Sequence, residues 1–254
     1  MSDYRAMWEC LDIDMPRHDM LMTALPAIYE KVYLSQSERP QAMGFYDFVV
    51  SEIHGLRVQE LMAHKEKGGK VFGTFCVYAP EEVILAASGI AVGLCGGADF
   101  SVPTAEQILP RNLCALIKSA FGFKLGRICP YFQAADLIVG ETTCDGKKKT
   151  WEILDEYIPT YVMDLPNSRT AADRDLWISE LKRFVGKVEN VTGNAVTPTK
   201  LAQATALLNR KRAALQRLYA LRQARPAPIS GLDALLVTQI SFYDDPARFT
   251  QKTN

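Results

Sequence analysis

The sequence has no excess of either charge and no long apolar run. Lys and Arg number 29, as do Asp and Glu, in a chain of 254 residues. A chain without net charge has no global attraction for nucleic acid or an anionic membrane surface. The longest apolar stretch, EEVILAASGIAVGLCGG, is broken by Gly before it reaches the ~20 apolar residues of a membrane span. The acidic N-terminus lacks a continuous apolar segment, so we see no signal peptide and expect a cytoplasmic protein.

Short motifs that would identify a chemistry are also missing. G-x-G-x-x-G, Walker A and H-E-x-x-H do not occur. Neither do the C-x2-C pairs of structural zinc sites or the compact ferredoxin run C-x2-C-x2-C. We interpret the three histidines, His18, His54 and His64, as surface or helix-packing residues rather than ligands, because they lie on or beside predicted helices.

Alternating strand and helix patterns fill residues 70–166. Hydrophobic residues make up 48% of the chain, which is enough for one sizeable core and part of another domain. Short β-rich runs predict four strands, at residues 70–78, 90–97, 135–143 and 159–166. Helical patterns stand between them, at residues 79–89, 101–123 (one or two helices, with Pro110 opening the second) and 144–158. This alternation predicts an α/β, Rossmann-like domain with a parallel sheet.

The regions before and after these strands have the sequence patterns of helices. Residues 17–66 show apolar spacing typical of helices, and residues 171–193 and 197–224 predict two amphipathic helices joined by a turn. The second is strongly basic, which we interpret as a solvated helix face in preference to a nucleic-acid surface, because no aromatic residues are interleaved. We expect three parts: an α/β domain with N-terminal helices (1–166), a helical linker (167–228) and the start of an incomplete second domain (229–254).

Five of the six cysteines fall at nearly regular intervals. Cys10 stands apart, and the other five are Cys76, Cys95, Cys114, Cys129 and Cys144. A single free cysteine usually packs as a small buried hydrophobe. Here Cys76, Cys95 and Cys144 follow predicted strands, so parallel pairing would bring them to one edge of the sheet, where open α/β sheets bind ligands. Cys114, within a predicted helix, and Cys129, in an irregular stretch, could turn toward the same edge.

Cys144 begins a predicted helix and is soon followed by Lys147, Lys148 and Lys149. A helix N-terminus favours a thiolate, and thiolates bind metal. The three lysines could offset the negative charge of several thiolates, or could be a solvated first turn. Widely spaced cysteines suit a cluster assembled by the tertiary fold, and the spacing alone leaves a metal-free or zinc-binding protein open.

Three blocks of the sequence carry a resemblance to a known family: VFGTFCVYAPEEVILAASGIAVGLCGGADF, LPRNLCALIKSAFGF and ADLIVGETTCDGKKKTWEIL. With the sequence around them, from about residue 45 onward, they resemble the 2-hydroxyacyl-CoA dehydratase D-component family, which includes the iron–sulfur subunits of benzoyl-CoA reductase. The resemblance implies an iron–sulfur cluster held by Cys76, Cys95, Cys114, Cys129 and Cys144, and electrons of low potential from an ATP-dependent activator protein. It also implies a small-molecule or acyl-CoA substrate and a homodimer or heterodimer.

Within the family, the chain is most similar to the double-cubane cluster proteins, because Cys95 and Cys129 add to the commoner positions Cys76, Cys114 and Cys144. Such proteins reduce small molecules with a double-cubane [8Fe–9S] cluster, where other members use [4Fe–4S] clusters and some are lyases. Members also have a second α/β domain with a further cysteine, which this sequence lacks. We therefore expect a fragment, and the alternative function is a non-catalytic metal-binding or interaction remnant.

Overall fold

Four short parallel strands form the centre of the molecule. The structure, a computed structural model, describes residues 4–94 and 97–254. The strands are β1 (Val71–Thr74), β2 (Ile90–Gly93), β3 (Leu137–Glu141) and β4 (Thr160–Met163), paired in the order β2-β1-β3-β4. Each lies within one of the four predicted segments, so the predicted α/β class with a parallel sheet is confirmed.

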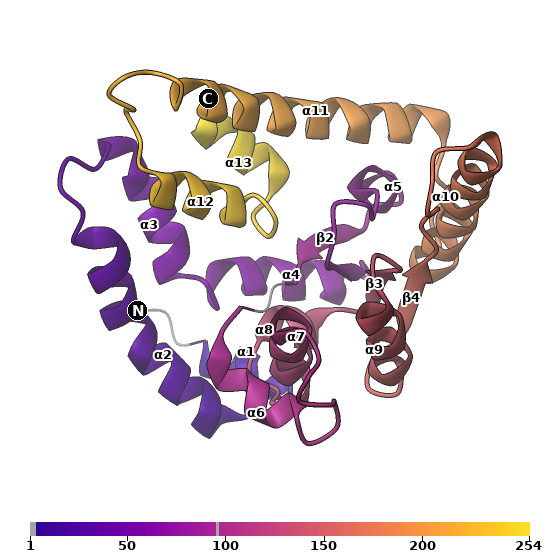
Figure 1. Cartoon of the computed structure of the whole chain (residues 1–254), viewed down its shortest axis with the longest axis horizontal. Coiled ribbons are helices and arrows are strands. Elements are labelled where there is room, and N and C mark those ends of the chain that lie inside the picture. Colours follow the sequence, from indigo (N-terminus) through magenta and orange to yellow (C-terminus); the bar gives the residue numbers. More distant parts are fainter. Residues whose placement is uncertain (1–3, 95–96) are drawn as a thin grey trace.

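The strand order creates a switch point between β1 and β3. The chain leaves β1 to form β2 on one side and then crosses over to form β3 on the other. In Figure 1, β2, β3 and β4 follow in this order from left to right. Thr74, the last residue of β1, lies opposite both Gly93 and Val139. Ligands of doubly wound sheets bind outside the carboxyl ends of the strands at such a point. The segments that follow β1 and β3 therefore leave the sheet where a site is expected.

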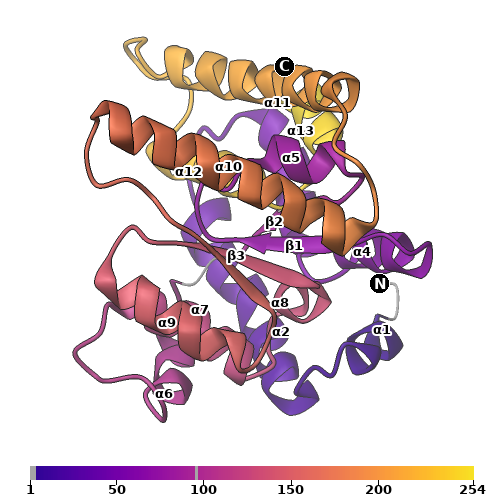
Figure 2. The same cartoon turned by 90° about the vertical axis from the view of Figure 1, so that its right-hand side faces the viewer.

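Helices cover both faces of the sheet. In Figure 2 the sheet crosses the middle of the view, with α5, α10 and α11 above it and α7, α8 and α9 below. The upper helices are α5 (Glu81–Ala86), α10 (Ala171–Thr192) and α11 (Pro198–Leu221). The lower face is covered by α4 (Leu56–Glu66), α7 (Ala115–Leu125), α8 (Pro130–Ala134) and α9 (Asp145–Asp155). Each face has its own apolar core, so the domain is a three-layer α/β/α sandwich.

The basic helix α11 is exposed at Arg210, Arg212 and Arg217, as predicted for a solvated face, but one of its cations is buried. Lys211 is buried, and its Nζ lies 2.6 Å from Glu81 Oε2 at the start of α5. Beside it, Arg212 Nη2 lies 2.5 Å from Glu82 Oε1. The physical reason is that α11 packs along α5, so the two glutamates in the first turn of α5 lie beside Lys211 and Arg212 of α11.

The N-terminal and C-terminal helices share a third apolar core. The N-terminal elements are α1 (Arg5–Cys10), α2 (Met15–Tyr29), the π-helical η1 (Glu30–Leu34), the 3-10 turn η2 (Gln41–Met43) and α3 (Gly44–Ser51). The C-terminal ones are α12 (Gly231–Ile240) and α13 (Pro246–Thr253). Tyr46 of α3, Leu218 of α11 and Phe249 of α13 meet in this core. Residues 229–254 thus form two helices and the turn between them, and the predicted domain boundaries stay a prediction.

The prediction that Pro110 opens a helix is wrong. The stretch forms the 3-10 turn η3 (Asp99–Ser101) and the short α6 (Val102–Ala105), and α7 begins only at Ala115. The cause is a buried cation. Lys118 Nζ donates to Glu106 Oε1 and to Arg111 O, both at 2.7 Å, and these bonds hold the chain before α7 as a loop.

No helix in the described ranges has both the length and the apolar character needed to cross a bilayer.

Candidate functional site

Two of the predicted ligands, Cys76 and Cys144, flank the switch point. Cys76 follows β1, which ends at Thr74, and Cys144 follows β3, which ends at Glu141. Because β1 and β3 are neighbouring parallel strands, both thiols leave the sheet at its carboxyl edge, as predicted. Cys76 starts a turn in which its carbonyl oxygen accepts from Ala79 N at 3.1 Å. Cys95, the third thiol predicted for this edge, lies outside the described residues.

Three cysteines occupy the same position relative to a helix. Cys114, Cys129 and Cys144 are the N-cap residues of α7, α8 and α9. This corrects the prediction for Cys114, which does not lie within a helix, whereas Cys129 ends an irregular stretch directly before Pro130, as predicted. N-cap positions favour Ser, Thr, Asp and Asn, whose oxygens bond the first backbone N–H groups. The side chains of Cys114 and Cys144 make no such bond. These three helices therefore begin at a residue type that is not favoured for capping.

The segments around Cys114 and Cys144 pack against each other. The absence of a side chain at Gly146 allows this close packing, because a Cβ built on it would lie 2.9 Å from Leu113 Cδ1 and 3.3 Å from Ile117 Cδ1. The same Cβ would stand 4.0 Å from Cys144 Sγ. The glycine of the sequence CDGKKK therefore lets α9 start directly beside the start of α7. Sequence reasoning did not single out Gly146, although a glycine in the first turn of a helix was a visible signal.

Helix α7 also fixes the loop after β2. Ser119 Oγ accepts from Gly97 N at 2.8 Å and from Ala98 N at 3.1 Å, so it holds the backbone just past Cys95. One turn further, Gly122 lets the helix approach Ser101, whose carbonyl oxygen would lie only 2.0 Å from an added Cβ. Neither residue was identified from the sequence, where the small residues of KSAFG were the only signal.

The beginning of α8, and with it Cys129, lies toward the carboxyl edge. Helix α4 leads into β1, so its last turn is near the amino edge of the sheet. There Lys65 Nζ donates to Ala134 O, at the end of α8, at 2.7 Å. At the opposite end, Tyr131 donates its hydroxyl proton to Ile53 O, before α4, at 2.7 Å. Tyr131 is buried, and burial raises its pKa well above the ordinary value, so it stays a neutral donor.

The three lysines after Cys144 differ in their surroundings. Lys148 pairs with Asp145 at 3.3 Å and Lys149 pairs with Glu152, and both are exposed, which agrees with a solvated first turn. Lys147 instead turns back to the end of β3.

There Lys147 Nζ bonds Glu141 Oε1, and Glu141 is only 2% exposed. Thr143 Oγ1 donates to the same oxygen at 3.0 Å. The second carboxylate oxygen, Glu141 Oε2, is buried and has no hydrogen-bond partner among the described residues. The edge thus holds a buried acid whose charge is balanced by one ammonium and whose hydrogen bonding is incomplete.

The described thiols do not converge on one point. Within residues 4–94 and 97–254, no three His, Cys, Asp or Glu side chains form a group that could hold a metal ion. The donor chemistry nevertheless suits an iron–sulfur cluster, since thiolates are its ligands and two thiols begin eleven-residue helices. Cys10 is exposed at the end of α1, on an element that does not follow a strand.

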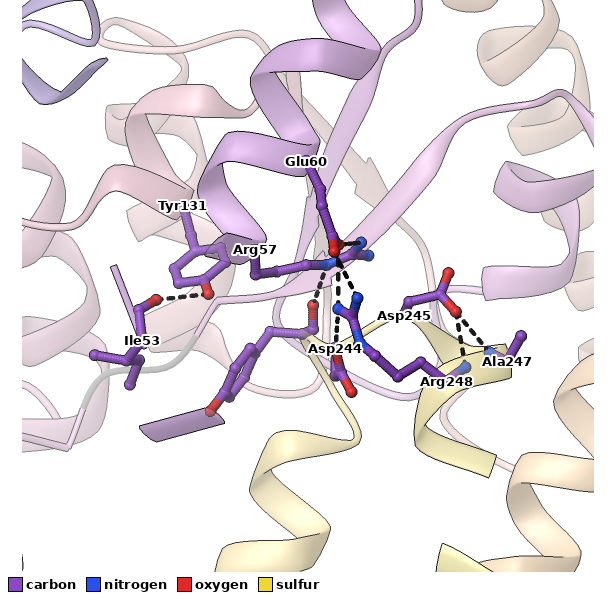
Figure 3. Close-up of polar contacts among 9 residues, drawn as sticks. Ile53, Arg57, Glu60, Tyr131, Asp244, Asp245, Ala247 and Arg248 are labelled. Atoms are coloured by element: carbon purple, nitrogen blue, oxygen red, sulfur yellow. Dashed lines mark hydrogen bonds and ion pairs between the residues drawn. The ribbon is translucent and has the colours of Figure 1, made fainter. Parts of the chain in front are cut away.

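A turn between α12 and α13, residues 241–245, supports the edge from the other side. Phe242 O accepts from Gly93 N, the last residue of β2, at 2.7 Å. Figure 3 shows how this C-terminal turn is tied to α4: Arg57 donates through Nε to Tyr243 O at 2.8 Å. Arg248 Nε bonds Asp244 Oδ1 at 2.9 Å, and its Nη1 bonds Glu60 Oε1 at 2.5 Å. The turn therefore links α13, α4 and β2.

Replacing Arg248 by methionine is expected to lower the free energy of unfolding by about 2 kcal/mol, because buried Asp244 then loses its counter-ion. The estimate is below the usual range for a buried pair because Arg248 is itself partly exposed. Urea unfolding followed by circular dichroism measures the change. Arg210→Met removes an exposed cation of α11 and serves as the control. A second variant, Asp244→Asn with Arg248→Met, should recover part of the loss, and equal losses in both would contradict the ion-pair explanation.

The chain belongs to the family described as 2-hydroxyglutaryl-CoA dehydratase, D-component, whose family model matches residues 76–254. The match begins at Cys76 and covers every predicted ligand. It confirms the family resemblance found in the sequence.

Curated relatives agree with this assignment. The chain is 43% identical over 218 residues to a putative dehydratase subunit, YjiM, of Escherichia coli (strain K12), which covers 85% of the chain and 52% of the relative. It is 23% identical over 197 residues to the (R)-phenyllactyl-CoA dehydratase beta subunit of Clostridium sporogenes, covering 76% of the chain and 52% of that protein. It is also 23% identical over 173 residues to a subunit of the benzoyl-CoA reductase of Thauera aromatica, covering 66% of the chain and 44% of that protein. The chain thus spans about half the length of the curated relatives it matches.

Proposed function

We propose that the chain is the iron–sulfur component of a dehydratase-family reductase and that it holds its cluster at the carboxyl edge of the sheet. The ligands in this proposal are Cys76, Cys95, Cys114, Cys129 and Cys144. The observation that carries it is the placement of three of them as N-caps of successive helices, beside a fourth at the switch point. Family membership and the relatives named as dehydratase and reductase subunits support it.

The side chains at the carboxyl edge would bind and orient the cluster. Cys144 begins α9, where the helix dipole favours a thiolate, and Gly146 lets the segment around Cys114 pack against the start of α9. Lys147 and Glu141 form a neutral pair at the same place and so add no net charge to the site. When bound, a cluster of this kind supplies an electron carrier whose potential depends on net charge, hydrogen bonds and burial.

The proposed partner is an ATP-dependent activator that delivers low-potential electrons. Two large apolar side chains directly after Cys76 support docking of a protein at this edge, since Val77 is 78% exposed and Tyr78 is 51% exposed. Reduction of a small molecule by a double-cubane cluster is favoured over dehydration of a CoA thioester, because the chain offers Cys95 and Cys129 as extra thiols. Homodimer or heterodimer formation and a cytoplasmic location remain part of the proposal.

Substituting the ligands should remove iron. Cys76→Ala, Cys114→Ala and Cys144→Ala are each expected to lower the iron and acid-labile sulfide bound after anaerobic purification, because each removes a thiolate ligand. Cys10→Ala, at an exposed position on α1, should leave both unchanged. Iron and sulfide are measured per chain, together with visible absorption.

The amounts of iron and sulfide bound per chain distinguish the candidate functions. A double-cubane centre gives roughly eight irons per chain and a single [4Fe–4S] cluster about four. Iron that is equal in the three variants and the unsubstituted chain would show that the thiols at the edge are not its ligands. Zinc, or no metal, in a folded chain would favour the alternative, a non-catalytic metal-binding or interaction protein.

A further inference from the structure

A buried acid, Glu141, ends strand β3 at the carboxyl edge of the sheet. It is only 2% exposed, and acids are almost never buried to this extent unless they are paired. Its Oε1 takes the ammonium of Lys147 and the hydroxyl proton of Thr143, whereas its Oε2 is buried and has no hydrogen-bond partner in the described part of the chain. Stability alone does not favour this arrangement, because a buried ion pair often contributes less than apolar packing of similar volume.

The ammonium that pairs with Glu141 belongs to the helix start that carries Cys144. Cys144 is the N-cap of α9 and Asp145 is its first residue, so Lys147 is the third residue of the helix. The side chains of the N-cap and of the third residue lie on the same side of a helix start, as in a capping box. The side chain of Lys147 is 19% exposed, so this cation stands beside the thiol and largely inside the protein.

Lys147 also lies near the segments of two other predicted ligands. It lines a small apolar cavity together with Phe75, which precedes Cys76, and Leu94, which precedes Cys95. An inward-facing ammonium is therefore placed among three of the thiol-bearing segments.

A charge in this place acts on the potential of a redox centre. Reduction by one electron adds one negative charge to the site, so a nearby ammonium stabilises the reduced form and raises the potential. Solvent and salt screen the charge of Lys148, whose side chain is 48% exposed, but screen the buried pair much less. Glu141 opposes the effect of Lys147, because its carboxylate carries the opposite charge and binds the ammonium directly.

We propose that Glu141 is a positioning residue that keeps the reduction potential of the site low, because it cancels the charge of Lys147 and holds the ammonium at the end of β3. This inference rests on the proposed function, since it concerns a cluster bound by Cys144 and its neighbours. It gives the buried pair a role in setting how strong a reductant the loaded protein is, which is separate from holding the metal.

Glu141→Gln tests the proposal, because glutamine keeps an acceptor oxygen for Lys147 but removes the negative charge. The anaerobically purified chain is titrated at one fixed pH with titanium(III) citrate, and the midpoint potential is read from the visible absorption. One electron passes from titanium(III), which becomes titanium(IV), to the bound cluster. The variant is expected to favour reduction by about tenfold, a rise of about 59 mV for one electron. An unchanged or lower potential in a folded variant with full iron would overturn the proposal.

The double variant Glu141→Gln, Lys147→Met separates charge from structure. It removes one charge of each sign, so the net charge of the site is unchanged and the potential should return to that of the unsubstituted chain. If the pair only held the fold, the double variant would be displaced at least as far as the single one, and that result would refute the electrostatic role. Lys148→Met removes an exposed cation of the same turn and should leave the potential unchanged.

If Glu141→Gln does not fold, Lys147→Met decides. This variant leaves the buried carboxylate without its counter-charge, so reduction should become less favourable, and an unchanged or higher potential would contradict the proposal. Iron content separates this inference from the proposed function. A folded unsubstituted chain that binds no iron overturns both, whereas full iron with equal potentials in the variants and the unsubstituted chain overturns the role of Glu141 alone.

Discussion

Gly122→Ala is expected to lower the free energy of unfolding by about 3 kcal/mol, although it adds a single methyl group. The added Cβ would stand 2.0 Å from the carbonyl oxygen and 2.7 Å from the carbonyl carbon of Ser101. Both are backbone atoms, so no side-chain rotation relieves the contact, and α7 must move away from η3. That movement also draws Ser119 from Gly97 and Ala98, which it holds by hydrogen bonds.

Gly186→Ala is the matched control. Gly186 lies in the interior of α10, and a Cβ added there meets nothing within 4 Å. Alanine has the higher helix propensity, so this variant should be more stable by up to about 1 kcal/mol. Urea unfolding of the two variants and the unsubstituted chain measures both effects. Changes of the same sign in the two variants would show that the close approach of α7 to Ser101 does not determine the stability at Gly122.

The same pair of variants connects packing to the site. If Ser119 positions the backbone beside Cys95, Gly122→Ala should also lower bound iron in the chain that remains folded, and Gly186→Ala should not. This result would assign the loss to the position of the loop, because neither substitution touches a thiol.

The sheet could be predicted because its signals are local. Each strand is a short β-rich run, and the alternation with helices determines that the pairing is parallel. The placement of Cys76 and Cys144 at the carboxyl edge follows from that topology alone. The N-cap position of Cys114 did not follow, because Pro110 gave a competing start signal and the bonds of Lys118 that override it are tertiary.

The contacts that support the site could not be predicted from local sequence patterns. Glu60 and Arg248 are 188 residues apart in sequence, and no periodicity relates them. The pairing of Glu141 with Lys147 spans only six residues, but β3 ends between them, so helical spacing did not suggest it. The C-terminal turn at residues 241–245 lies in the stretch expected to begin a second domain, yet its backbone bonds the end of β2.

The histidines were predicted to pack helices, and two of them do so as a buried pair. His18 Nε2 and His54 Nδ1 are 2.9 Å apart, and the side chains are 0% and 6% exposed. Trp8 of α1 joins them, because its ring lies 4.3 Å from His18 between centroids and its Nε1 donates to His54 O at 2.7 Å. The pair therefore fastens α1 and α2 to the turn before α4.

Acid should weaken this attachment. Burial, and then the neighbouring His18, lower the pKa of His54 to about 3 from 6.5, and burial lowers the pKa of His18 as well. Below pH 6.5 the unfolded chain takes up protons that the folded chain does not, so the stability contributed by the neutral pair is lost as the pH falls. At about 1.4 kcal/mol per unit, His54 alone costs about 2 kcal/mol between pH 7 and pH 5.

The double variant His18→Asn, His54→Asn isolates this effect, because the amides keep hydrogen-bonding groups but do not titrate in this range. It should be less stable than the unsubstituted chain at pH 7 and should lose about 2 kcal/mol less on going to pH 5. Carboxylates contribute equally to both chains, so the difference between the two pH dependences reports the pair. His64→Gln, in α4 and outside the pair, is the control and should keep the full dependence. Urea unfolding at the two pH values measures the free energies of unfolding. Parallel losses in the double variant and the unsubstituted chain would assign the acid sensitivity to other groups.

Because Tyr131 packs edge-on against His54 and follows Cys129 by two residues, the same loss of attachment would reach the end of α8 that carries the proposed ligand.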